Sequence, residues 1–124
     1  KRIAFIDLGS NSVRFVIYEI SKTGSYRLIY QEKNSVRLSE NMWGTQKLTN
    51  EAMERSLRSL KAFVHMAEAM DVDTIKAVAT AAVRLAKNGD IFIKTVKEQT
   101  GLDLECIAGE EAVSYTHLRA HETL

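Results

Sequence analysis

The N-terminal sequence reads Ile3-Ala4-Phe5-Ile6-Asp7-Leu8-Gly9-Ser10-Asn11-Ser12, an apolar run that ends in a cluster of turn-forming residues. Such a run is typical of a buried strand, which we predict over residues 3–8. Residues 13–20 are rich in β-branched and aromatic side chains and predict a second strand directly after the turn. A loop at residues 21–25 and a third strand at about 26–38 complete an antiparallel meander.

The middle of the chain predicts a long amphipathic helix. Thr49 lies where a helix cap is expected, and Glu51 follows in the first turn, where an acidic residue complements the helix dipole. Apolar residues then recur at alternating steps of four and three, which places them on one core-facing stripe: Met53, Leu57, Leu60, Val64 and Ala67. The side expected to face solvent carries Arg55, Arg58 and Lys61.

Three further apolar residues of this helix lie beside the main stripe, namely Phe63, Met66 and Met70. A wide core-facing stripe would explain them. A surface that packs on a second domain, or on another subunit of a homodimer, would explain them equally well. The sequence leaves both alternatives open. His65, which lies between them, is expected to be a partly buried surface histidine.

The remaining pattern alternates strands with helices. After a meander, this alternation predicts an α/β fold with a mixed sheet of about five strands, its later crossovers parallel and right-handed, and helices packed on the sheet. The expected elements are a strand at residues 75–80, a helical segment at 81–86, a helix from an Asn88 cap through Thr100 that stops at Gly101, and a last strand at 102–107.

Composition and charge limit the class of protein. The 124 residues suffice for one domain with one core. Seventeen basic against sixteen acidic residues give no electrostatic preference for nucleic acid or for a membrane surface. The single cysteine, Cys106, excludes an intramolecular disulfide, and no long apolar run or signal-peptide pattern is present. We therefore expect a cytoplasmic protein with neither a nucleic-acid nor a membrane partner.

The turn after the first predicted strand carries groups suited to binding phosphate. Gly9 permits close approach of the backbone, and Ser10, Asn11 and Ser12 supply hydroxyl, amide and main-chain N–H donors. Asp7, at the end of the strand, is placed to hold Mg²⁺ directly or through water beside a phosphate. An ordinary hairpin turn explains the same residues, and the motif alone does not decide between the two.

Two further strand ends carry charged side chains. Arg84 follows a predicted strand by about one helical turn, where its guanidinium can bind an oxyanion, although an ordinary solvent-facing arginine is the alternative. Gly109 precedes Glu110 and Glu111, which point about 100° apart on a helix, so that one of them can act as a general base. Both glutamates could instead simply complement a helix N-terminus.

Taken together and in this order, the three strand ends resemble the exopolyphosphatase / guanosine-pentaphosphate phosphatase (Ppx/GppA) family. The resemblance runs from Ile3 through Ala112. Its specific strings are Ile6-Asp7-Leu8-Gly9-Ser10-Asn11-Ser12 and Gly109-Glu110-Glu111-Ala112, and it is supported by the turn at residues 79–84, Lys87-Asn88-Gly89 and Thr100-Gly101-Leu102.

The resemblance implies the actin-like ATPase fold, built on a ribonuclease-H-like sheet that is used twice, with the active site between the copies. Residues 1–112 are similar to the first copy, incomplete at its C-terminal end, so a second domain is an implied partner. Glu111 is implied as the base that activates water, Gly9, Ser10, Asn11 and Ser12 as the phosphate-binding turn, Asp7 as the residue near Mg²⁺, and Arg84 as a phosphate ligand. The implied reaction releases terminal phosphate from inorganic polyphosphate or guanosine pentaphosphate.

Two other functions stay open. One is a kinase or other nucleotide-binding member of the actin-like group, against which the Gly-Glu-Glu-Ala string argues. The other is a non-catalytic phosphate- or nucleotide-binding module, because donors on one side of a cleft stay exposed to water, which weakens each interaction. For the same reason, we expect the chain by itself to be inactive.

The C-terminal residues 113–124 depart from the family pattern. The family pattern leads us to expect an amphipathic helix here, whereas the sequence resembles foreign sequence joined to a truncated reading frame. We therefore expect residues 113–124 to be a non-native or chimeric tail. Because the sequence starts at Lys1 rather than at a methionine, we also expect the chain to be a piece of a longer protein.

Overall fold

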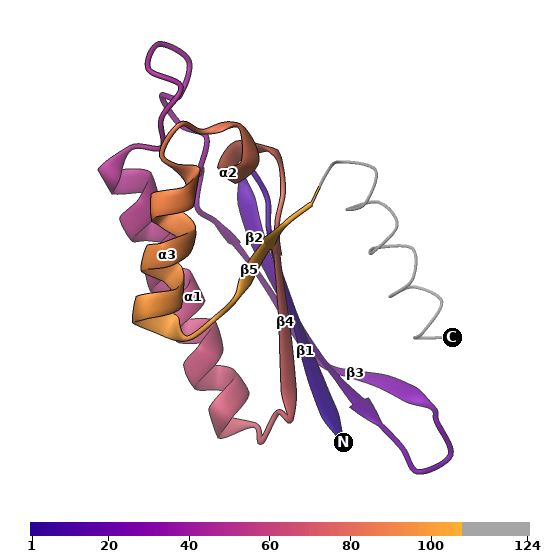
Figure 1. The fold of residues 1–124 in the computed structure, drawn as a ribbon. Helices are drawn as coiled ribbons and strands as arrows, with labels where there is room; N and C mark the ends of the chain where they lie inside the picture. Colours follow the sequence, from indigo (N-terminus) through magenta and orange to yellow (C-terminus); the bar gives the residue numbers. More distant parts are fainter. Residues whose placement is uncertain (108–124) are drawn as a thin grey trace.

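A computed structural model describes residues 1–107, and its first three strands form an antiparallel meander (Figure 1). The strands are β1 (Arg2–Leu8), β2 (Ser12–Ile20) and β3 (Tyr26–Ser35). In β1, alternate residues are buried, because successive side chains of a strand point to opposite faces of the sheet. In β2, Val13, Phe15 and Ile17 continue this alternation, and Val16 is buried as well. The predicted meander is confirmed.

The helices and strands that follow extend this meander into a mixed five-stranded sheet of order β3-β2-β1-β4-β5. β4 pairs with β1 and β5 pairs with β4, both in parallel, as predicted. The additional elements are α1 (Asn50–Ala69), β4 (Thr74–Ala79), α2 (Ala81–Leu85), α3 (Gly89–Thr100) and β5 (Leu104–Cys106).

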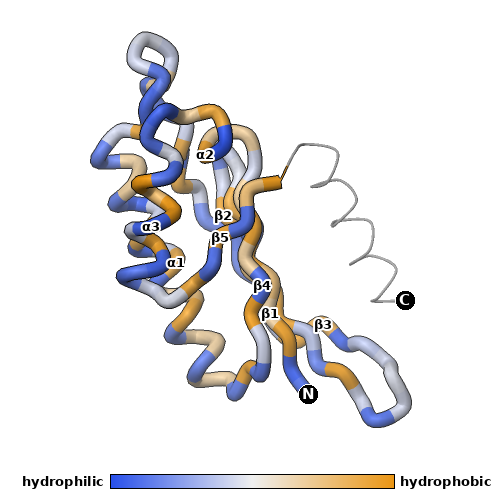
Figure 2. The backbone as a smooth tube through the Cα atoms, viewed as in Figure 1, coloured by the Kyte–Doolittle hydropathy of each residue, from blue (hydrophilic) through white to orange (hydrophobic). Residues whose placement is uncertain are grey.

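The two long helices, α1 and α3, lie side by side against one face of the sheet (Figure 1). Phe15 of β2 and Phe63 of α1 are fully buried there, with their rings stacked at a centroid distance of 4.7 Å. Phe63 therefore belongs to the core of this domain, while Met66 and Met70 are partly buried against that core. Figure 2 shows the hydrophobic residues along β1 and β4 and hydrophilic ones at the tip of the β2–β3 hairpin.

The predicted helix ends are confirmed where the signal is local. The Thr49 side chain accepts a hydrogen bond from the Ala52 amide at 3.1 Å and caps α1. Gly101 ends α3 in the left-handed region, with a φ of 79°. No helix within residues 1–107 is long and apolar enough to span a membrane.

Two predicted strands are longer than the observed ones. β3 ends at Ser35 rather than Leu38, because the next amides leave the ladder and donate to the Asn11 carbonyl. β5 begins at Leu104 rather than Leu102, because the Leu102 amide is bound to the Thr100 hydroxyl at the exit from α3. In both cases a contact with a neighbouring turn or helix end replaces strand pairing.

Three side-chain predictions were wrong. Arg55 does not face solvent but is partly buried and bonds to the segment after β3. Asn88 does not cap α3 with its side chain, which instead bonds to both the amide and the carbonyl of Leu48, at 2.8 and 3.0 Å. His65 is exposed rather than partly buried.

Candidate functional site

The candidate site lies where the parallel strands of the sheet end. Because β1, β4 and β5 run in the same direction, their carboxyl ends meet at one edge, where α/β sheets commonly bind ligands. The Thr80 amide donates to the Leu8 carbonyl at 3.1 Å, and the Ile107 amide to the Ala79 carbonyl at 2.9 Å. The turn between β1 and β2 is therefore joined to the end of β4.

This turn is tight, and its first position favours glycine. The Gly9 amide donates to the Ser12 carbonyl at 2.9 Å, which closes the turn. A Cβ atom on Gly9 would lie 3.3 Å from that same oxygen and 3.9 Å from the Thr80 hydroxyl oxygen. The close approach of the Ser12 carbonyl, rather than an unusual φ angle, accounts for the preference for glycine.

The Ser10 and Asn11 carbonyls of the turn are both occupied by the segment after β3. The Ser10 carbonyl accepts from the Ser39 amide at 3.1 Å and from the Ser39 hydroxyl at 3.4 Å. The Asn11 carbonyl accepts from the amides of Val36 and Arg37, both at 2.9 Å. Within residues 1–107, no hydrogen bond uses the amides or side chains of Ser10 and Asn11, so these donors are available for an oxyanion.

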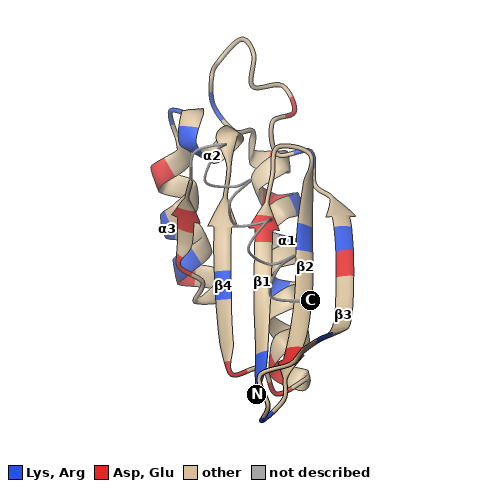
Figure 3. Ribbon diagram, turned by 90° about the vertical axis from the view of Figure 1, so that its right-hand side faces the viewer, with Lys and Arg blue, Asp and Glu red and all other residues tan. Residues whose placement is uncertain are grey.

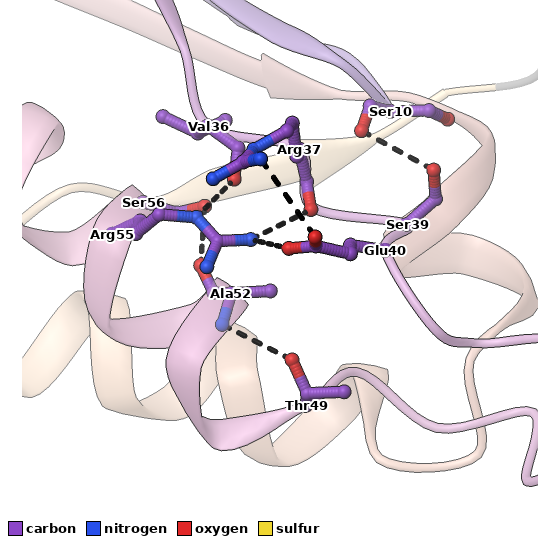
Figure 4. Close-up of polar contacts among 9 residues, drawn as sticks. All are labelled: Ser10, Val36, Arg37, Ser39, Glu40, Thr49, Ala52, Arg55 and Ser56. Atoms are coloured by element: carbon purple, nitrogen blue, oxygen red, sulfur yellow. Dashed lines mark hydrogen bonds and ion pairs between the residues drawn. The ribbon is translucent and has the colours of Figure 1, made fainter.

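Arg55 holds the segment that occupies those carbonyls (Figure 4). Its guanidinium donates to the Val36 carbonyl at 2.9 Å and the Arg37 carbonyl at 3.2 Å, and it pairs with the Glu40 carboxylate at 2.5 Å. The Arg55 side chain is only 21% exposed, so these bonds are partly screened from water. Arg55 of α1 thereby positions the loop that contacts the turn at residues 9–12.

Asp7 lies beside the turn on the sheet face opposite α1 and α3. Its Cα pairs across the strands with Arg14 of β2, and Figure 3 shows the acidic band of β1 level with the basic band of β2. Within the described residues, no group of three or more metal-ligating side chains exists. One carboxylate at a strand end still suits Mg²⁺, because this ion commonly keeps several waters and binds one or two carboxylates beside a phosphate.

Arg84 is not brought to the turn by any contact within residues 1–107. It is exposed at the end of the five-residue helix α2. Burial, followed by the Asp90 carboxylate, raises the pKa of the Cys106 thiol, whereas Arg84 lowers it. The helix that carries Arg84, α2, contacts β5. Its predicted role as a phosphate ligand stays a prediction.

Sequence reasoning missed four residues that belong to the surroundings of the site: Arg14, Ser39, Arg55 and Thr80. Arg14 could have been found, because the short turn between the two predicted strands places it directly opposite Asp7. Residues that face each other across an antiparallel pair lie on the same face of the sheet. Ser39 and Thr80 could not, since they contact residues 29 and 72 positions away. Glu111 lies outside the described residues, as does the predicted tail at residues 113–124.

Together, this sheet order and the turn at the carboxyl end of β1 define an actin-like ATPase domain of the ribonuclease-H-like type. The model of the Ppx/GppA phosphatase family matches residues 16–124. The chain belongs to the Ppx/GppA phosphatase family.

Three comparisons describe its similarity to other proteins. The guanosine-5'-triphosphate,3'-diphosphate pyrophosphatase of Pseudoalteromonas atlantica is 42% identical over 117 residues, which are 93% of this chain and 23% of that protein. The Aquifex aeolicus Ppx/GppA structure matches 99% of this chain and 40% of its own at a TM-score of 0.92 and 34% identity. An exopolyphosphatase structure from Cytophaga hutchinsonii matches 89% of this chain and 35% of its own, at a TM-score of 0.84 and 31% identity. The chain thus spans between about a quarter and two fifths of these relatives.

Proposed function

We propose that this chain supplies the first-domain half of a phosphoanhydride hydrolase, which releases terminal phosphate from inorganic polyphosphate or guanosine pentaphosphate. The observation that carries the proposal is the turn at residues 9–12: the Ser10 and Asn11 carbonyls are occupied by the segment after β3, while no hydrogen bond within residues 1–107 uses the Ser10 and Asn11 amides. Such a turn suits a phosphate rather than a cation. Membership in the Ppx/GppA phosphatase family supports the same chemistry.

The reaction needs an oriented water and neutralised phosphate charge, with little covalent work by the protein. Water attacks the terminal phosphorus, the bridging P–O bond breaks towards the rest of the chain, and the water proton passes to the Glu111 carboxylate. Asp7 would hold Mg²⁺, which when bound neutralises charge on the phosphate oxygens. Gly9, Ser10, Asn11 and Ser12 bind the phosphate, and Arg84 adds positive charge.

The role of Glu111 is tested in the longer protein that carries this domain. Glu111→Gln should reduce phosphate release from polyphosphate and from guanosine pentaphosphate by about 100-fold or more, because it removes the general base. Substrate binding should be retained. Glu110→Gln is the matched control, with the same change of charge one position away, and should stay active. Phosphate release that survives in Glu111→Gln would remove Glu111 from the base role.

A non-catalytic phosphate-binding module is the second candidate. It is favoured because the chain spans only about a quarter to two fifths of its relatives, so that all donors described here come from one domain. Phosphate release measured on this chain and on the longer protein separates the two functions. Turnover by the longer protein alone supports a two-domain hydrolase, whereas binding without turnover in both supports the module.

A further inference from the structure

The edge of the sheet at β3 carries a polar cavity. It has a volume of about 420 Å³, within the usual size range of small-molecule pockets, and lies where the end of β3 meets the first half of α1. None of its lining residues belongs to the turn at residues 9–12. The polar residues of the lining include Asn34 and Ser35 of β3 and Arg55, Arg58 and Ser59 of α1.

The lining of this cavity is basic and holds no carboxylate. The Arg55 guanidinium uses Nε and Nη2 to bond to the segment after β3, but no hydrogen bond within residues 1–107 uses its Nη1. Arg58 is exposed, and its side chain makes no hydrogen bond or ion pair within the same residues. Because residues three apart are neighbours on a helix surface, the two guanidinium groups can reach one ligand.

The Ser59 hydroxyl adds a third donor. Its oxygen accepts a hydrogen bond from the Asn34 side-chain amide at 3.2 Å, across the junction of β3 and α1. Ser59 is partly buried, and no other hydrogen bond in the described part of the chain uses its hydroxyl. Because a hydroxyl can donate as well as accept, its hydrogen is available to an acceptor in the cavity.

Lys33 is also a lining residue, but its place in the strand limits its role. Asn34 bonds to Ser59 of α1, so the preceding residue, Lys33, has its Cβ on the opposite face of the sheet. There it lies across the strands from Arg14 of β2, another basic residue. Lys33 therefore adds positive charge near the cavity, while the direct donors come from α1.

This set of donors fits an oxyanion. Guanidinium groups bind phosphate and carboxylate oxygens through paired, charge-assisted hydrogen bonds. A tetrahedral phosphate can accept from two guanidinium groups and a hydroxyl that approach from different directions, whereas a carboxylate offers two oxygens in one plane. The absence of a carboxylate from the lining leaves the positive charge to the ligand.

We propose that this cavity is a second oxyanion site, which binds inorganic phosphate through Arg58, the Nη1 of Arg55 and the Ser59 hydroxyl. The inference goes beyond the proposed hydrolysis and does not depend on it, because it uses no group of the turn at residues 9–12.

Amide NMR signals of the chain report on the cavity and on the turn separately. Inorganic phosphate, titrated at constant ionic strength, should shift the amides of Asn34, Ser35 and Ser59 along a saturating curve. Acetate should bind there at least about fivefold more weakly, because it offers fewer acceptor oxygens. Unsaturable shifts at these amides, or equal affinities for phosphate and acetate, would overturn the proposal.

The role of Arg58 is tested by substitution. Arg58→Gln should weaken phosphate binding at the cavity about fivefold or more, because it removes a charge-assisted contact from an exposed position. Lys61→Gln is the matched control: it removes one charge from an exposed position of the same helix outside the cavity, and should leave the affinity unchanged. Equal weakening in both variants would mean diffuse attraction rather than a site.

Ser59→Ala tests the hydroxyl without changing the charge. It should weaken phosphate binding at the cavity about threefold, and its urea midpoint shows whether the fold is retained. Gly9→Ala separates this inference from the proposed function. It alters the turn, so it should leave the titration of the Asn34 and Ser35 amides unchanged. If Arg58→Gln instead weakened the response of the Ser10 and Asn11 amides equally, the cavity would not be a separate site.

Discussion

At the scale of single residues, Arg55 and Gly9 have the clearest physical consequences. Arg55 places a charged group, only 21% exposed, against two backbone carbonyls and a carboxylate, and so holds the loop that occupies the carbonyls of the turn. Gly9 leaves room for that turn to close. Neither is expected to touch substrate through its side chain, so both act by positioning the donors that would.

Arg55→Ala should lower the free energy of unfolding by about 2 kcal/mol, because hydrogen bonds to a charged group are lost and two carbonyls are left without their donor. Urea unfolding of the chain measures this. Arg58→Ala, at an exposed position three residues further along α1, is the control and should stay within about 0.5 kcal/mol of the parent. Equal effects of the two substitutions would show that the Arg55 contacts contribute nothing.

Gly9→Ala should weaken tripolyphosphate binding about fivefold, because the new Cβ would lie 3.3 Å from the Ser12 oxygen and push the turn open. Gly44→Ala is the matched control, since a Cβ there meets nothing within 4 Å. Calorimetric titration compares the two. A Gly9→Ala variant that binds as tightly as the parent would mean that the turn accommodates the methyl group without shifting its donors.

At the scale of elements, α1 is joined to the sheet by the Phe15–Phe63 stack. The helix begins at a well-formed Thr49 cap and buries one face against β2, so that its own propensity and its packing agree. Its first turns also support the candidate site through Arg55. The stability of α1 and the geometry of the turn are therefore coupled.

Phe63→Ala should destabilise the chain by about 3–5 kcal/mol, because it removes a fully buried ring and leaves a cavity beside Phe15. Phe63→Leu should cost less, since it refills most of the volume. His65→Ala, on the exposed side of the same helix, should change little. Chemical unfolding monitored by circular dichroism orders the three variants, and a Phe63→Ala variant no weaker than His65→Ala would contradict the observed core.

At the scale of elements, most of the fold could be predicted from short sequence patterns. The meander, the Thr49 cap, the Gly101 stop and the parallel crossovers follow from signals a few residues long, and all were predicted. The ends of β3 and β5 were predicted wrongly, because each is set by a hydrogen bond to a different element. Of the candidate site, the turn and Asp7 were predicted, but the residues that support them were not.

At the scale of the whole molecule, the two ends of the sheet have different roles. The carboxyl ends of β1 and β4 carry the candidate site, whereas the opposite end is held by ion pairs. There Glu19 accepts from Arg2 at 3.1 Å and from Arg27 at 2.7 Å, which joins β1, β2 and β3. Arg2 also donates to the Met70 carbonyl at the end of α1.

These ion pairs make the stability of the fold depend on pH. The hydrogen bonds from Arg2 and then Arg27 lower the pKa of Glu19 below its ordinary value of 4.5. A carboxylate with a lowered pKa stabilises the folded state above that ordinary value, and the contribution is lost as the pH falls through the lowered pKa. Glu19→Gln should therefore reduce the urea midpoint at pH 7 more than at pH 3, and an equal reduction at both would contradict the assignment.

The sequence by itself determined the order of strands and helices, the turn at residues 9–12 and the family, because these depend on periodicity and on motifs of adjacent residues. Only the tertiary structure decided that Arg55 and Ser39 support the turn and that Trp43 and Leu85 line a cavity beside it. The physical reason is distance along the chain: such contacts join residues tens of positions apart, and packing of the helices and loops on the sheet, not local preference, brings them together.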